Sequence, residues 1–314
     1  MSSIDLALLV LAAGLGLCMA RVSLCAVAAV AAWIRARQYG GLRALLLAAS
    51  AAGLTLLGSA LIWPGTTLLP VAGASLSIAL LGGSLLGVGA LLNGGCYLGS
   101  VTYLGTGNCN YLLTLLGFAV AARWLHPMPT MLRAEFVTSH GDVLLICGLV
   151  VFAIAIWFAA RASWPPRRQP EGAIRAAWPW PLAAIMAGVL AGLVYSRHAG
   201  WSYTRPIDAL ARGRFTAAEA MGLYATMALF AGVIVSALWA GKFRWVRLTP
   251  VKSGRCLLGG VVMGYGAAMV PGGNDTLLLW AIPGLETRGL IAFAAMLAVI
   301  ASAFTAAGRI RRRR

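Results

Sequence analysis

The chain has 314 residues, of which 61% are hydrophobic and only 11% are charged. Apolar runs of about 20 residues recur along the whole sequence, and one water-soluble core cannot hide that much apolar surface. The composition therefore excludes a soluble globular protein and predicts a protein embedded in a lipid bilayer. The net charge of +17 gathers in loops and in the Arg-rich C-terminal tail. This pattern is typical of the cytoplasmic loops that orient a membrane protein, and we favour that explanation of the charge over nucleic-acid binding.

The apolar runs predict an all-α polytopic membrane protein with about nine transmembrane helices. In chain order the expected spans are residues 5–34, 43–62, 75–93, 111–125, 142–160, 178–196, 218–240, 256–271 and 289–307. Basic clusters lie near Arg35, from Arg161 to Arg175, from Lys242 to Arg255, and at the C-terminus. Placing all four in the cytoplasm puts the N-terminus outside and the C-terminus inside, in a bacterial-type inner membrane. The first run is too long for a signal peptide, so we interpret the sequence as mature.

Two glycine-rich segments indicate an internal duplication. Residues 81–96 align without gaps on residues 258–273, with seven of sixteen positions identical, and an offset one residue shorter pairs Arg21 with Arg197. The expected organisation of the single membrane domain, residues 1–314, is a first repeat at 5–125, a connector with an unpaired span at 126–177, a second repeat at 178–307 and a basic cytoplasmic tail at 308–314.

The two copies have opposite orientations in this interpretation. The second span of the first copy leaves the basic loop at Arg43, whereas its counterpart runs into the basic loop at Lys242. Inverted repeats are frequent in secondary transporters, and they place the substrate site near the bilayer midplane between the halves. We therefore expect two inverted repeats that form a central constriction.

Each half also carries a break in the middle of an apolar stretch. Proline removes a backbone donor and glycine loosens the chain, so helices should end near Asn93 and Val270 and restart as short broken or re-entrant helices. The residues that predict these breaks are Gly94, Gly95, Pro271, Gly272 and Gly273. Broken backbone at membrane depth is tolerated only inside protein or beside a water-filled cavity, so the four glycines are expected to line a permeation path. Other glycines at GxxxG spacing fit close helix packing instead, namely Gly83, Gly87, Gly260 and Gly264.

One further break is expected earlier in each half. The first apolar run contains Gly14, Gly16 and Arg21, and its counterpart contains Arg197, Gly200 and Pro206. Four broken segments would then meet near the centre, where amides at restarting helix ends offer donors to an anion.

The charged residues near the breaks leave two interpretations open. Arg21 and Arg197 either attract an anion or simply snorkel or pair with Asp208 or a carbonyl. Asp275, which follows Asn274, is either a helix N-cap or a polar member of the path.

The six cysteines show no CxxC pair and no Cys/His metal spacing, so we expect no metal and no cofactor. They are Cys18, Cys25, Cys96, Cys109, Cys147 and Cys256. Cys147 lies in an apolar segment and is interpreted as a small core residue, whereas Cys25 and Cys96 lie at expected breaks in the helical backbone. The chain carries no nucleotide-binding motif, so we expect no ATP use.

Three motifs resemble the YeeE/YedE family of sulfur-compound transporters, whose best-understood members take up thiosulfate. They are Arg21-Val-Ser-Leu-Cys25, the segment from Gly94-Gly-Cys-Tyr-Leu-Gly to Gly107, and Gly259-Gly-Val-Val-Met-Gly-Tyr-Gly266 leading into Pro271-Gly-Gly-Asn-Asp275. The resemblance covers most of the chain. It implies an hourglass-shaped protein plugged by short helices and loops, whose central cysteines pass the substrate along by S–H hydrogen bonds. By position Cys25 and Cys96 match two of three such cysteines, and Gly273 stands at the third.

The leading hypothesis is a transporter, not an enzyme, that takes up a small sulfur oxyanion such as thiosulfate. A thiol is a weak, polarisable donor, and apolar burial favours the neutral thiol over a thiolate that would repel an anion. The glycine at position 273 motivates a second hypothesis, in which the cargo is a selenium compound or another sulfur species. A third is a membrane thiol-disulfide oxidoreductase that uses Cys18 and Cys25. The resemblance also suggests a soluble cytoplasmic sulfur-carrier protein as partner, besides the lipid bilayer.

Overall fold

The computed structural model describes residues 3–63, 65–72, 75–124, 132–136, 142–164, 178–198, 201–202, 204–270 and 272–313. The helices are α1 (Ser3–Val22), α2 (Ala26–Ala36), α3 (Gly40–Ile62), α4 (Leu76–Asn93), α5 (Tyr97–Gly105), α6 (Leu112–Trp124), α7 (Asp142–Ser163), α8 (Trp180–Arg197), α9 (Arg205–Ala211), α10 (Ala217–Trp239), α11 (Pro250–Met269), α12 (Asn274–Thr276) and α13 (Thr287–Arg313). A 3-10 turn η1 (Cys109–Tyr111) precedes α6, and a π-helical segment η3 (Leu277–Ala281) follows α12. The strands are β1 (Leu68–Ala72) and β2 (Leu132–Phe136), which pair antiparallel.

The predicted all-α polytopic class is confirmed, but the predicted count of nine spans is not. Across the described residues, seven helical segments are long and apolar enough to cross a bilayer, or eight if α11 and the segment after it, bent by 52°, form one broken span. The expected span at 111–125 is instead α6, which has 13 residues. At 1.5 Å per residue it is about 20 Å long, which is shorter than a hydrocarbon core of about 30 Å.

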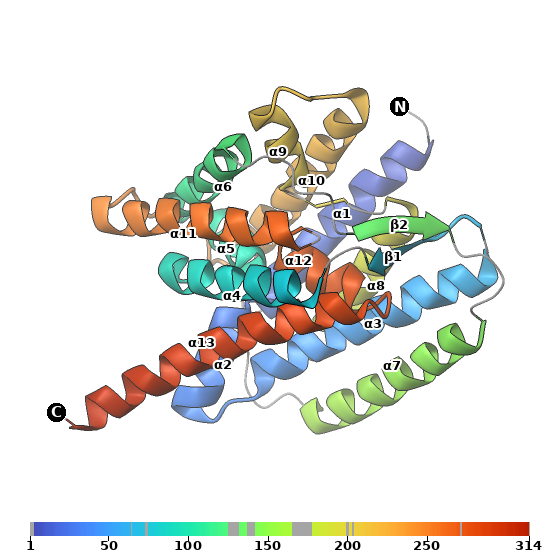
Figure 1. Ribbon diagram of the computed structural model, residues 1–314, viewed down its shortest axis with the longest axis horizontal. Coiled ribbons are helices and arrows are strands. Elements are labelled where there is room, and N and C mark those ends of the chain that lie inside the picture. Colours follow the sequence, from blue (N-terminus) through green and yellow to red (C-terminus); the bar gives the residue numbers. More distant parts are fainter. Residues whose placement is uncertain are drawn as a thin grey trace.

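Lipid-facing surface is evident on α7, the helix that the sequence left without a counterpart. Only 22% of its most apolar window is buried within the protein. Its large side chains Ile154, Trp157 and Phe158 are between half and two-thirds exposed. A water-soluble protein does not expose a whole helix of this kind, so α7 lies against acyl chains. Figure 1 shows α7 at the margin of the helix assembly, beside α3.

Glycines allow the helices of the interior to pack closely. A Cβ atom at Gly83 or Gly87 would overlap the backbone of α13, and one at Gly260 or Gly264 would meet α6. The predicted packing role of these four glycines is therefore confirmed. Small residues are how membrane helices approach one another when lipid offers no hydrophobic driving force.

The two earliest glycines have the same role, which corrects an expectation. Gly14 and Gly16 were expected to interrupt the first apolar run, but both lie inside the continuous helix α1. A Cβ at Gly16 would overlap the backbone carbonyl of Leu229 on α10, and a Cβ at Gly14 would contact Leu190 on α8. The break in this run comes later, at residues 23–25.

Candidate functional site

The first break separates α1 from α2. Ser23 has a positive φ of 52°, and the chain resumes its helix at Ala26 with Cys25 in the N-cap position. Cys25 is fully buried. Since Arg21 lies in the last turn of α1 and Cys25 is the N-cap of α2, the predicted motif does coincide with a broken helix.

The second break separates α4 from α5. The prediction that a helix ends near Asn93 is confirmed, because α4 ends at this residue and Gly94 follows with a φ of +76°. Asn93 holds the break together: its Nδ2 donates to the Gly95 carbonyl at 2.6 Å and its Oδ1 accepts from Thr114 Oγ1 at 2.7 Å. Cys96 is the N-cap of α5 and is fully buried. A short polar network thus fixes the position of this thiol.

The first two breaks meet although the two residues that join them, Ala26 and Cys96, are 70 positions apart in the sequence. The Ala26 amide, next to Cys25, donates to Cys96 Sγ at 3.3 Å. The Cys25 thiol lies against Gly99 in the first turn of α5, where a Cβ would be 2.6 Å from the sulfur. A larger residue than glycine at position 99 would overlap the Cys25 side chain.

The third break separates α11 from α12. Helix α11 ends at Met269, as predicted, and Gly272 has a φ of +83°. Gly273 is the N-cap of α12, with φ −75° and ψ −175°, almost the backbone conformation of Cys96, at φ −76° and ψ −179°. Pro271 lies outside the described residues.

The fourth break lies between α8 and α9. Of the residues expected to interrupt this run, Arg197 ends α8, Pro206 lies in the first turn of α9, and Gly200 is outside the described residues. The connecting residues Ser202 and Thr204 are buried and hydrogen-bond to each other at 2.7 Å.

Hydrogen bonds join the four breaks in series. The first is joined to the second by the Ala26–Cys96 contact. The second is joined to the third because Asn274 Oδ1 accepts from the Tyr97 amide at 3.0 Å. The third is joined to the fourth because Ser202 Oγ donates to Asp275 Oδ2 at 3.0 Å. The structure therefore brings together Cys25, Cys96, Gly273, Asn274 and Asp275.

The two arginines are not part of this chain of contacts. Arg21 is 4% exposed and lies between two indoles, 5.0 Å from the Trp178 ring centroid and 4.6 Å from that of Trp239. Arg197 is exposed, and its guanidinium is 5.9 Å from the Trp63 ring centroid. Asp208, one of the alternative partners considered for these arginines, forms an ion pair with Arg212 at 2.9 Å. Cation–π contact with tryptophan holds both guanidinium groups at helix ends.

Sequence reasoning missed a cation beside the second break. Lys252, in the first turns of α11, donates from Nζ to the Asn93 carbonyl at 2.7 Å and lies 4.8 Å from the Tyr111 ring centroid. It would also lie 3.0 Å from a Cβ at Gly94. A cation at the C-terminal end of α4 is favoured by the helix dipole. In the sequence Lys252 was one member of a basic cluster, and nothing marked it as reaching a break 159 residues away.

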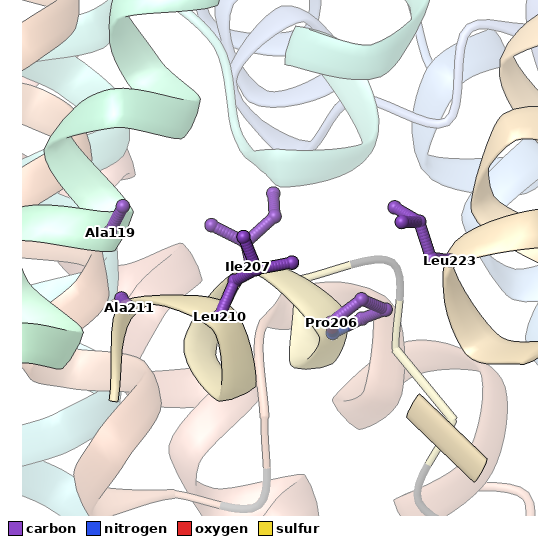
Figure 2. A pocket seen from close by; sticks show the side chains of 6 residues that line it. All are labelled: Ala119, Pro206, Ile207, Leu210, Ala211 and Leu223. Atoms are coloured by element: carbon purple, nitrogen blue, oxygen red, sulfur yellow. The ribbon is translucent and has the colours of Figure 1, made fainter. Parts of the chain in front are cut away.

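An apolar recess opens between α6, α9 and α10 (Figure 2), with a volume of about 290 Å³. It is lined by Ala119, Pro206, Ile207, Leu210, Ala211 and Leu223. None of these side chains can donate a hydrogen bond, so the recess offers nothing to an anion.

Comparison with known families identifies the chain. A family model described as sulphur transport matches residues 21–301, which include all four breaks and both central cysteines. The chain belongs to the sulphur transport family. The predicted resemblance to YeeE/YedE proteins is thereby confirmed. No curated protein matches the chain.

Membership gives this sulphur transport protein a coarse function. It is a multi-pass membrane protein, and its family points to transport of a sulfur compound rather than to enzymatic catalysis. The membrane-spanning architecture and the family agree, because a transported solute needs a route through the bilayer that broken helices inside a helical assembly can provide.

Proposed function

We propose that this protein takes up a small sulfur oxyanion, thiosulfate or a near relative, through a central constriction at Cys25 and Cys96. The observation that carries the proposal is the meeting of two fully buried thiols from two different helix breaks. Structural cysteines that only fill a core have no reason to occupy two N-cap positions at broken backbone. A pair of weak, polarisable donors offers the serial contacts that conduction needs, since tight binding would stop release.

The restarting helix α5 adds a further attraction for an anion. Cys96 is its N-cap residue, but the Cys96 side chain makes no capping hydrogen bond to the helix amides. Amides at the beginning of a nine-residue helix favour negative charge. Lys252 adds a positive charge on the other side of the same break, where it binds the Asn93 carbonyl. These contacts support an anionic rather than a cationic cargo.

We also propose that the two halves form an inverted repeat. The aligned glycines support it: Gly82 approaches Gly266 and Gly89 approaches Gly259, and the alignment of 81–96 on 258–273 exchanges these two contacts. The arginines support it too. Arg21 of the first half stacks on Trp239 of the second, and Arg197 of the second stacks on Trp63 of the first. One sequence offset relates both the arginines and the tryptophans, as expected for a two-fold arrangement.

For orientation, we propose an inner-membrane protein with the N-terminus outside and the C-terminus in the cytoplasm. Figure 1 shows the two termini at opposite ends of the molecule. Contacts join three of the four basic clusters: Arg35 lies over Phe304 near the end of α13 at 4.7 Å, and Arg43 donates to the Ala162 carbonyl, beside Arg161, at 2.6 Å. Clusters gathered on one face support its placement in the cytoplasm.

Uptake measurements test the cysteine pair. Cells that lack other thiosulfate importers, or proteoliposomes, receive radiolabelled thiosulfate, and initial rates are compared for the wild type, Cys25→Ala and Cys96→Ala. Each substitution should lower uptake about tenfold or more, the effect of losing one hydrogen bond to a charged group. Cys147→Ala is the matched control, because this thiol is exposed on α7. If both central variants transport at the wild-type rate, the thiol pair does not handle the cargo.

The alternative of a selenium compound or another sulfur species has one observation in its favour. At Gly273 the third thiol of the family pattern is replaced by hydrogen, and a Cβ there would lie 2.5 Å from Asp275 Oδ1 and 2.9 Å from the Tyr97 ring. A cargo that needs three thiols would not suit this site. Competition of selenium and sulfur oxyanions against labelled thiosulfate in proteoliposomes would separate the two cargoes.

The disulfide-exchange alternative gains no support from the geometry. Cys18 is buried in α1, whereas Cys25 lies at the break where the adjacent Ala26 amide donates to Cys96. All six cysteines are free thiols. A cytoplasmic sulfur carrier remains a proposal from family resemblance; co-purification with a purified carrier would test it.

A further inference from the structure

Asp275 is a carboxylate buried at the junction of the third and fourth breaks. It is 2% exposed, and its neighbours Ser202 and Thr204 are 4% and 2% exposed. Ser202 Oγ donates to its Oδ2, while its Oδ1 is buried with no hydrogen-bond partner within the described residues. Burying an ionised carboxylate without full compensation is costly, so a bound ion or water at this oxygen would lower the free energy of the folded protein.

Within the part of the chain that the structure describes, the groups found to act on this carboxylate are the Ser202 hydroxyl and the backbone amides of Asp275 and Thr276. The titratable side chains that face it are the phenols of Tyr97 on α5 and Tyr195 on α8. The two ion pairs found among the described residues, Arg205 with Glu219 and Arg212 with Asp208, do not include it. The other groups at hand are hydroxyls, which are hard oxygen ligands. The site therefore has the chemistry of a cation site rather than of an anion site.

The two halves differ in the atoms that join their breaks, which supports an anion site in one half and a cation site in the other. The contact of the first two breaks, Ala26 with Cys96, uses a sulfur atom. The corresponding contact of the other two, Ser202 with Asp275, uses only oxygen atoms. Soft ligands suit a polarisable sulfur compound, and hard oxygen ligands suit a small hard cation. Asn274 connects the two by its bond to the Tyr97 amide, so occupancy of one can influence the other.

The negative charge of the proposed cargo gives a physical reason for a co-transported cation. A sulfur oxyanion that enters a cell moves against the inside-negative membrane potential, and each negative charge carried adds to the opposition. Cations that enter with the anion reduce or cancel this charge. In broken-helix transporters, unwound segments at the midplane are where coupling ions bind.

From these observations we propose that Asp275, together with the Ser202 and Thr204 hydroxyls, binds the monovalent cation that is co-transported with the anion. The proposal rests on the proposed function and names its driving ion class. Sodium ions and protons share the required chemistry, since either neutralises the buried carboxylate. The experiment below distinguishes them.

Two assays in proteoliposomes separate cargo handling from coupling. Counterflow measures exchange of labelled for unlabelled thiosulfate without any ion gradient, and gradient-driven uptake measures the response to an imposed inward gradient. One arm applies a sodium gradient at equal pH, with choline as replacement, and the other applies a proton gradient in the absence of sodium. The wild type should show counterflow when the driving cation is present at equal concentration on both sides, and at least a tenfold stimulation by one of the two gradients.

Asp275→Asn should retain counterflow but lose the stimulation, because the amide is neutral without a cation. Glu286→Gln is the matched control: Glu286 is also a buried carboxylate, but its two oxygens accept from the Arg288 and Gly289 amides. It should keep the wild-type response. Should Asp275→Asn not fold, Ser202→Ala replaces it and should raise the apparent KM for the driving cation severalfold at an unchanged counterflow rate.

The outcomes separate this proposal from the proposed function. Absence of wild-type counterflow would contradict thiosulfate transport itself. Wild-type counterflow without any response to sodium or protons would overturn the cation site alone. A wild-type gradient response in Asp275→Asn would also overturn the cation site. An unchanged KM for the cation in Ser202→Ala would do the same. Loss of both activities in a folded Asp275→Asn protein would place this residue on the anion path instead.

Discussion

At the scale of single residues, Cys96 and Gly273 show how a duplicated backbone carries unequal chemistry. Both are N-caps with nearly the same φ and ψ. At Cys96 a thiol fits, and its sulfur accepts a hydrogen bond from the Ala26 amide. At the second, Asp275 Oδ1 and the Tyr97 ring occupy the space that a Cβ would need. The absence of the third cysteine is therefore tied to the presence of the buried carboxylate beside it.

A prediction follows for Gly273→Cys, which would restore the third cysteine of the family pattern. The new side chain must displace Asp275 or Tyr97, so we expect a loss of stability of about 1–3 kcal/mol and lower uptake. Thermal unfolding in detergent and initial uptake rates would measure both. Gly58→Cys is the control, because no heavy atom lies within 4 Å of a Cβ at that position. Faster thiosulfate uptake with unchanged thermal stability would contradict the steric argument.

At the scale of elements, helix contacts depend on which glycines face a neighbour. On α11 a Cβ at Gly260 would overlap the backbone of Thr114 on α6, whereas a Cβ at Gly254 has no heavy atom within 4 Å. The periodic spacing of Gly260 and Gly264 predicted the packing role. Spacing could not show that the partner is α6, a helix of 13 residues.

We predict opposite effects for the two substitutions on α11. Gly260→Ala should destabilise the protein by about 1–3 kcal/mol, because the added methyl pushes α6 away. Gly254→Ala should be neutral or stabilising by up to about 1 kcal/mol, since alanine is the better helix former. Thermal unfolding of both purified variants checks the pair. Equal melting temperatures for the two would show that α6 and α11 do not pack as described.

At the scale of the whole molecule, the basic loops and the position of the termini make a topology prediction. Arg35 lies against Phe304 near the C-terminal end of α13, on the side that we assign to the cytoplasm. Fusions test the assignment. A fluorescent protein at the C-terminus should fluoresce, and alkaline phosphatase at the N-terminus should be active outside. An active phosphatase fused to the C-terminus would show that the orientation is reversed.

Much of the architecture could be predicted because it depends on composition and on neighbouring residues. Apolar runs must avoid water, and a glycine at positive φ ends a helix without a partner from elsewhere. That is why the helix ends at Asn93 and near Val270 were found from the sequence. The span at 111–125 was mistaken because hydropathy reports only apolar length, and this run is a short helix beside α11.

The sequence by itself determined that this is a helical membrane protein of the sulphur transport family with backbone breaks in both halves. Only the tertiary structure decided what meets at those breaks: Cys96 with Ala26, Asn274 with Tyr97, Asp275 with Ser202, and Lys252 with Asn93. The physical reason is range. Helix propensity and membrane partition act between neighbours along the chain, whereas these contacts join residues that are distant in sequence and depend on how whole helices pack.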